Sequence, residues 1–110
     1  MAYIQNLVID QGATFSTSVT VTDAEGDALN LTSYLLRGQM RKSYASSSYT
    51  SFTAISETPT SGVIDISLTA TQTGELKAGR YVYDVEMEDT AGVVTRIVEG
   101  IITVTPQVTR

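Results

Sequence analysis

The most regular alternation of apolar and polar positions lies between Leu76 and Val104 and predicts a long β-hairpin. Two alternating strands flank a turn at Asp89–Gly92. One face of the first strand carries Tyr81, Tyr83, Val85 and Met87. Strict alternation divides the second strand into one face with Arg96, Val98, Gly100, Ile102 and Val104 and another with Thr95, Ile97, Glu99, Ile101 and Thr103.

Shorter alternating runs precede the hairpin and predict further strands, separated by turns that contain Gly, Pro or Asp. The second run sets a Ser/Thr-rich face opposite Phe15, Val19 and Val21. Leu29 and Leu31 indicate a short strand or plug that crosses between two sheets. The expected strands before the hairpin are Tyr3–Asp10, Ala13–Asp23, Tyr34–Lys42, Ser51–Glu57 and Val63–Thr69.

Three local signals modify this pattern. Gly38 lies inside an expected strand, where glycine weakens pairing, so we expect a bulge or a close approach by another backbone. Residues 69–76 predict one helical turn, capped by Thr71 and anchored to the core by Leu76. Pro106 ends the last strand because proline cannot donate to a central ladder.

About seven strands with turn signals roughly every ten residues are typical of a β-sandwich. Leu76 and Tyr81 flank a loop that enters a long strand, an arrangement that resembles the tyrosine corner of immunoglobulin-like domains. We therefore expect an all-β chain: a single immunoglobulin-like antiparallel β-sandwich over residues 1–110 with one short helical turn.

The composition excludes several classes of function. The chain has neither Cys nor His, so it cannot form a Ser-His-Asp or Cys-His triad, or a zinc site built on imidazole or thiolate. No cofactor is expected. With 7 basic and 12 acidic residues the net charge is 7 − 12 = −5, which disfavours non-specific nucleic-acid binding. Residues 1–5 lack the features of a signal peptide, and no run is apolar enough to predict a membrane span.

The candidate contact residues are a basic cluster and two tyrosines. Arg37 and Arg41 project from the same strand face, about 13 Å apart, with Lys42 next in the chain. This cluster suits an acidic surface on a neighbouring subunit, and the alternative is an ordinary solvated strand face. Tyr44 and Tyr49 lie in a Ser-rich loop, where they suit contact with a protein or a sugar.

Carboxylates gather at two other places. Asp84 and Glu86 share a strand face at a separation of about 7 Å, compatible with a glycosidase pair, or with a hydrophilic outer face that resists edge pairing. The loop 23–27 holds three carboxylates and suits weak Ca²⁺ binding or a plain acidic turn. The terminal strands either close the sandwich or add to the sheet edge of a neighbour.

Nearly the whole chain resembles small virion structural proteins of tailed bacteriophages, especially those of cyanobacteria and marine bacteria. It is also similar in plan to the N-terminal β-sandwich domain of phage baseplate upper proteins. The resemblance rests on a spaced pattern of acidic, glycine, apolar and tyrosine positions. These are Asp10, Gly12, Phe15, Asp23, Gly26, Leu29, Leu31, Thr32, Arg41, Lys42, Leu68, Thr69, Leu76, Gly79, Tyr81, Tyr83, Asp84 and Glu86.

The resemblance implies a non-enzymatic component of the virion, either an accessory or decoration protein or a tail-baseplate part. Its partners would be capsid or tail subunits, in a multicopy homo-oligomer assembled in the host cytoplasm, with no nucleic acid and no membrane. The contact candidates remain Arg37, Arg41, Lys42, Tyr44 and Tyr49. Two alternatives stay open: a carbohydrate-binding module for attachment to the host surface, and a glycosidase that uses Asp84 and Glu86.

Overall fold

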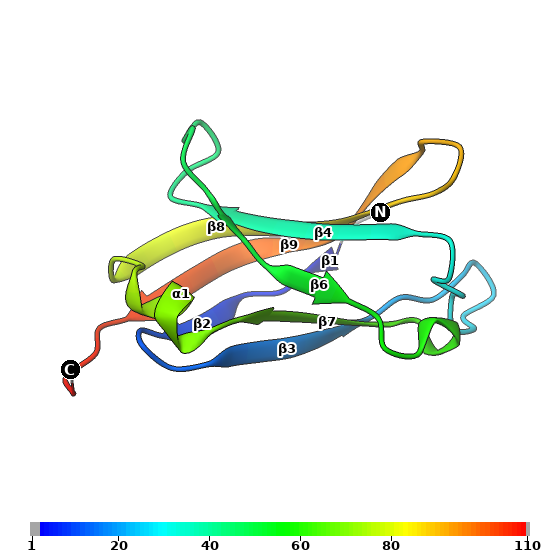
Figure 1. Cartoon of the computed structure of the whole chain (residues 1–110). Helices are drawn as coiled ribbons and strands as arrows, with labels where there is room; N and C mark the ends of the chain where they lie inside the picture. The colour runs from blue at the N-terminus through cyan, green and yellow to red at the C-terminus, as the bar shows by residue number, and fades with distance from the viewer. Residues whose placement is uncertain (1–2, 110) are drawn as a thin grey trace.

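The predicted hairpin forms the centre of a six-stranded sheet, the large sheet, in a computed structural model that describes residues 3–109 (Figure 1). Its strands are β8 (Gly79–Glu88) and β9 (Val94–Thr105), which pair antiparallel around the turn predicted at Asp89–Gly92. The remaining strands of this sheet are β4 (Leu35–Arg41) and β5 (Thr50–Ser51) beyond β8, and β1 (Tyr3–Ile4) and β2 (Leu7–Asp10) beyond β9.

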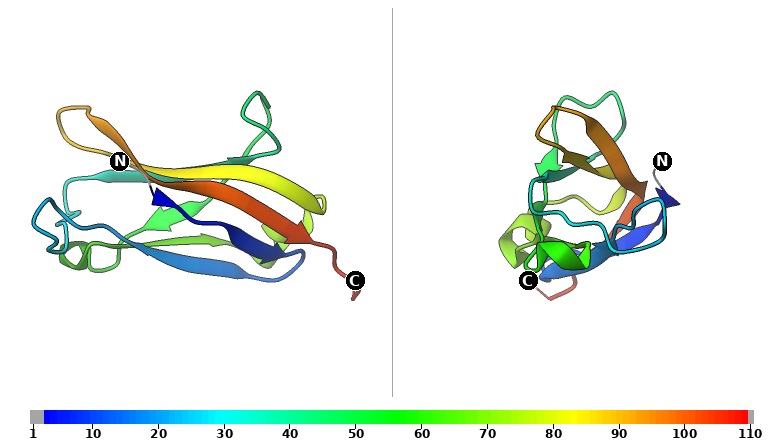
Figure 2. Two further views of the ribbon diagram at one scale, coloured as in Figure 1. Left: turned by 180° about the vertical axis from the view of Figure 1, so that it is seen from behind. Right: turned by 90° about the vertical axis from the view of Figure 1, so that its right-hand side faces the viewer.

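A small sheet of three antiparallel strands covers the inner face of the large sheet (Figures 1 and 2). Its order is β3–β7–β6, with bounds Phe15–Thr20, Val63–Leu68 and Thr53–Ile55. Residues expected to face inward on these strands are buried or half-buried, and Ile64, Ile66 and Leu68 lie in the core. The two-layer arrangement confirms the predicted immunoglobulin-like β-sandwich.

The chain passes from one sheet to the other at Phe52, within the strand expected at Ser51–Glu57. Residues before Phe52 pair with β4 in the large sheet, and residues after it pair with β7 in the small sheet. The Phe52 amide donates to the Gly38 carbonyl at 2.9 Å. A Cβ atom at Gly38 would lie 3.2 Å from both the Asp84 carbonyl oxygen and the Phe52 ring, so the expected close approach is confirmed.

The N-terminal strand is broken and runs parallel to the last strand, so the large sheet is mixed, whereas an antiparallel sandwich was expected. β1 and β2 both pair parallel with β9, with Leu7 beside Ile102 and Ile9 beside Val104. The run predicted as one strand is interrupted at residues 5–6, where the chain crosses Gly100 of β9. The Gln5 carbonyl accepts a hydrogen bond from the hydroxyl of Tyr83 at 2.7 Å. This bond ties the interrupted segment to a core residue of β8.

A β-bulge between Val85 and Glu86 corrects the predicted faces of β9. Before the bulge Glu86 pairs with Arg96, whereas beyond it Val85 pairs with Val98, so Ile97 is an extra residue. The insertion shifts the alternation by one position, because two residues of β9 oppose one of β8. Ile97 is therefore buried beside Val98, and Arg96 lies on the outer face, contrary to strict alternation.

Two short helical segments flank β7. The helix α1 (Ala70–Gly74) is capped by Thr69, whose side chain accepts from the Gln72 amide, so the expected cap at Thr71 was two residues too late. Thr73 of α1 is fully buried, and its hydroxyl donates to the Ala13 carbonyl at 2.8 Å. A 3₁₀ turn, η1 (Pro59–Ser61), precedes β7.

Leu29 and Leu31 form the predicted plug, and neither residue belongs to a strand. Leu31 is buried, and its amide donates to the Pro59 carbonyl at 2.8 Å. At the opposite end of the sandwich, the Tyr81 hydroxyl donates to the Lys77 carbonyl at 2.8 Å, which confirms the corner expected before the long strand. The first bond joins a loop to η1, and the second joins a loop to β8.

Candidate functional site

The outer face of the large sheet gathers four of the charged residues that the sequence singled out, Arg37, Arg41, Asp84 and Glu86. Residues with side chains on this face come from three neighbouring strands, because alternate positions of a strand point to the same side. They are Arg37, Gln39 and Arg41 of β4, Asp84, Glu86 and Glu88 of β8, and Arg96 and Glu99 of β9. We call this set the charged face.

Arg37 bridges two carboxylates of the neighbouring strand. Its Nε lies 3.1 Å from Glu86 Oε1, and its guanidinium NH1 lies 2.9 Å from Glu88 Oε1. The β4–β8 register places Arg37 directly opposite Glu86, so the contact follows from strand pairing. Hydrogen bonds to Glu88 and then to Glu86 raise the pKa of Arg37. The basic candidate Arg37 is thus paired within the chain.

Arg96 makes the second bridge of the charged face, between β8 and its own strand. Its Nε lies 3.4 Å from Asp84 Oδ2, and NH1 lies 3.6 Å from Glu99 Oε1. Burial raises the pKa of Asp84, the nearby Glu86 carboxylate adds to this rise, and Arg96 opposes it. The bulge makes this ion pair possible, because the register shift places Arg96 on the outer face, where Asp84 lies.

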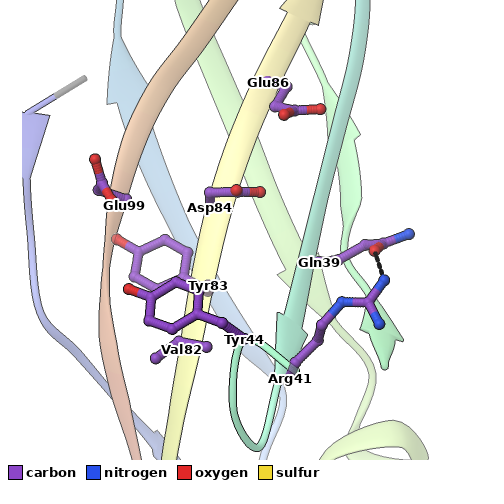
Figure 3. Close-up of a pocket in the computed structure, with 8 residues that line it drawn as sticks. All are labelled: Gln39, Arg41, Tyr44, Val82, Tyr83, Asp84, Glu86 and Glu99. Atoms are coloured by element: carbon purple, nitrogen blue, oxygen red, sulfur yellow. Dashed lines mark hydrogen bonds between the residues drawn. The ribbon is translucent and has the colours of Figure 1, made fainter. Parts of the chain in front are cut away.

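A shallow hollow of about 270 Å³ lies beside these pairs (Figure 3). Tyr44 stands over one side of it, and its side chain is 81% exposed. The remaining lining is mainly polar and charged, and Arg41 donates to Gln39 Oε1 at 3.1 Å across the strand face. Its lining residues are Gln39, Arg41, Tyr44, Val82, Tyr83, Asp84, Glu86 and Glu99.

The other basic candidates each contact a tyrosine, and Arg41 also holds the tyrosine-bearing loop in place. Arg41 donates to the Ser46 carbonyl at 2.6 Å, and its guanidinium carbon lies 4.9 Å from the centre of the Tyr49 ring. Lys42 Nζ lies 4.8 Å from the centre of the Tyr81 ring. Both contacts have cation–π geometry. Arg41 holds the loop against the sheet, whereas Lys42 contacts a residue of β8. Among residues 3–109, Tyr44 makes no such contact and is exposed, so it is the candidate most accessible to a partner.

The carboxylates of the other hypotheses have structural roles. Asp23 Oδ1 accepts the amides of Glu25 and Asp27, each at 3.0 Å, which folds the acidic loop on itself. Within residues 3–109, no group of three or more His, Cys, Asp or Glu is placed to hold a metal ion. Asp84 and Glu86, the proposed glycosidase pair, lie on an open sheet face, and each contacts an arginine.

Sequence reasoning missed Gln39 and Glu99 as lining residues of the hollow. Glu99 comes opposite Asp84 only because the bulge shifts the register of β9. No sequence signal marked the bulge, since Ile97 and Val98 are apolar neighbours in a run of β-branched residues. Gln39 lies between Arg37 and Arg41 on the same strand face, and the density of charged residues around it was the available signal.

The fold and this open face define an immunoglobulin-like sandwich. No family model matches the chain, and no curated protein matches it. Among solved structures, the chain is similar to a variant of the SrpA adhesin of Streptococcus sanguinis (TM-score 0.53, 14% identity) and to an internalin-like protein of Listeria monocytogenes (TM-score 0.50, 19% identity). It also aligns with murine CRIg (TM-score 0.44, 9% identity, covering 93% of this chain and 92% of that one).

The alignments cover nearly all of this chain but only part of the bacterial proteins. They cover 92% of this chain and 55% of the adhesin, and 94% of this chain and 28% of the internalin-like protein. At such low identity the likeness shows the fold alone. The virion family named above on sequence grounds stays a prediction. No helix in the described part of the chain is long and apolar enough to span a membrane.

Proposed function

We propose that the chain is a non-enzymatic structural protein of a tailed-phage virion, an accessory, decoration or tail-baseplate component that assembles through subunit contacts. The observation that carries this proposal is the internal pairing of the charged face. Arg37 and Arg96 each bridge two carboxylates of the same chain, so the groups best suited to chemistry are paired with one another within the sheet. The groups that remain available to partners are exposed side chains on the surface of the sandwich.

The accessible features support contact rather than catalysis. Tyr44 stands free above the hollow, and several apolar side chains of the large sheet are exposed, including Ile4, Val8 and Ile101. Exposed aromatic and aliphatic side chains on a rigid sheet are suited to protein interfaces. Repeated copies in a particle need such complementary surfaces, because each copy meets its neighbours by symmetry.

The test is the location of the protein in particles. Purified virions would be separated into heads and tails and probed with an antibody to this chain. We expect the protein in one fraction at a fixed ratio to the major capsid or tail protein. Its absence from particles that otherwise contain every expected structural protein would contradict the proposal, and a catalytic or secreted role would have to be considered.

The hollow under Tyr44 supports a second candidate, a carbohydrate-binding module. An exposed tyrosine beside amide and carboxylate groups provides an apolar ring face for stacking and hydrogen-bond partners for hydroxyls. Isothermal titration with host-surface polysaccharide would test it. Binding that is lost in Tyr44→Ala and kept in Tyr49→Ala would favour this candidate, whereas no heat with any host glycan would exclude it.

A further inference from the structure

The free edge of β3 is the longest uninterrupted strand edge among the described residues. In the small sheet β3 pairs with β7 alone, over all six residues from Phe15 to Thr20. No hydrogen bond involving residues 3–109 reaches the backbone groups on its other side. The other sheet edges are shorter or broken: β5 has two residues, β6 has three, and the β1–β2 edge is interrupted at residues 5–6.

The direction of the free backbone groups follows from the ladder with β7. The amide of Val21, just beyond β3, donates to the Gly62 carbonyl at 2.7 Å and continues this ladder. Bonded and non-bonded residues alternate along an antiparallel strand, so the amides and carbonyls of Ser16, Ser18 and Thr20 point away from β7. Consistently, Ser18 and Asp65 form a directly opposed pair whose side chains bond at 2.7 Å.

This edge lacks the features that usually prevent strand addition. Natural edge strands are blunted by Lys, Pro, a bulge, short length or a covering segment. The sequence FSTSVT contains no charge and no proline, and its pairing with β7 is regular throughout. We infer that β3 is an assembly edge, which pairs antiparallel with β3 of a second copy of this chain and joins two small sheets into one.

The strand is complementary to itself about a two-fold axis through Ser18. In that register Ser16 lies opposite Thr20 of the second copy, and Ser18 lies opposite its own counterpart. All outward-pointing amides and carbonyls then find partners, because these residues form the hydrogen-bonded pairs. On the inner face Thr17 lies opposite Val19 of the second copy. No like charges meet along the strand, so direct pairing carries no ionic penalty.

The charge of the whole chain predicts how the pairing responds to salt. Each copy carries a net charge of −5, so two copies repel one another at long range. Added salt screens this repulsion, and the association should strengthen as salt rises. A complex held by the charged face would weaken instead, because salt screens its ion pairs. The sign of the salt effect therefore separates the two interfaces.

The experiment measures association of the full chain by sedimentation over a wide concentration range, with two variants at Ser18. Ser18→Pro removes an edge amide that does not serve the β7 ladder, so folding is kept, and dimerisation should weaken by about tenfold or more. Ser18→Ala is the matched control: it loses the Asp65 contact, keeps the amide and should still associate. Circular dichroism would confirm that both variants are folded.

Hydrogen exchange on the unmodified chain gives an independent readout. The amides of Ser16, Ser18 and Thr20 should exchange rapidly in dilute solution and become protected as concentration rises, whereas exchange in β2 should not change. A chain that stays monomeric, a dimer without this protection, or equal loss of association in both variants would overturn the inference. The β3 pairing would supply one of the subunit contacts of the proposed assembly role. Its biological purpose rests on that proposed function, which the particle fractionation tests separately.

Discussion

The hydroxyl of Tyr83 on β8 donates to the backbone carbonyl of Gln5, 2.7 Å away and 78 positions earlier in the chain. The bond fastens the N-terminal segment to the core at the point where β1 and β2 are interrupted. Tyr83 is nearly buried, and burial, with a smaller effect from Tyr3, raises its pKa to about 12. The hydrogen bond and the raised pKa of Tyr83 lead to a first prediction.

Tyr83→Phe should destabilise the chain by about 1 kcal/mol at neutral pH, because it removes one hydrogen bond and leaves the Gln5 carbonyl without it. The folded pKa of Tyr83 lies above its unfolded value of about 10, so its stabilising effect is complete below about pH 10 and is lost as pH rises toward 12. Urea denaturation at pH 8 and between pH 10 and 12 would measure both effects. An alkaline loss as steep in the variant as in the original chain would contradict this assignment.

Gly100→Ala should destabilise the chain by about 1–3 kcal/mol. A Cβ atom at this position would clash with the Gln5 carbonyl oxygen, so the N-terminal segment would have to move away from β9. Gly74→Ala is the matched control: its nearest neighbour would lie at 3.9 Å, and alanine favours the helix. Thermal unfolding of both variants would measure the difference. Equal midpoints would show that the segment yields without cost.

Two isoleucines of β9 test the bulge. Ile97 is 6% exposed and Ile101 is 41% exposed, although strict alternation places both on the same face. Ile97→Ala should therefore cost about 2–4 kcal/mol and Ile101→Ala about 1 kcal/mol or less, because only the first leaves a cavity in the core. Denaturant titration of both variants measures these costs. Equal costs would argue for an unbulged strand.

The helix cap gives a similarly paired comparison. Thr69→Ala should destabilise the chain by about 0.5–2 kcal/mol, because the Thr69 hydroxyl accepts from the Gln72 amide and forms half of a capping box. Thr71→Ala should be neutral or slightly stabilising, since Thr71 is exposed within the helix and alanine is the better helix former. Thermal unfolding would measure both variants. A larger loss for Thr71→Ala would move the cap to the position that the sequence suggested.

Asp84→Asn should change stability at pH 7 by no more than a few tenths of a kcal/mol, despite the loss of its contact with Arg96. The pKa of Asp84 is raised, mainly by burial, so its ionised form is disfavoured in the folded state. The favourable effect of its protonated form is present at acid pH and lost as pH rises through the folded pKa. The variant should therefore show a flatter stability profile above pH 4. A loss of more than about 1 kcal/mol at pH 7 would show that the ion pair dominates.

The sequence by itself determined most of the strand content, the inward-facing residues outside the bulged start of β9, and the sandwich class. Alternation is a local property with a period of two residues, and burial of one strand face makes it visible, as at Val19, Ile66 and Val85. The expected close approach at Gly38 and the corner at Tyr81 also follow from local rules, because each depends on one residue type in a recognisable place.

Only the tertiary structure decided how the charged and edge groups are used. The bulge at Ile97, the bridge from Arg37 to Glu86 and the contact of Tyr83 with Gln5 depend on register between strands that are distant in sequence. One residue of slip in that register moves a side chain to the opposite face, and no local pattern fixes it. The free edge of β3 likewise follows from which strands pair, because the N-terminal segment joins β9 and leaves β3 uncovered.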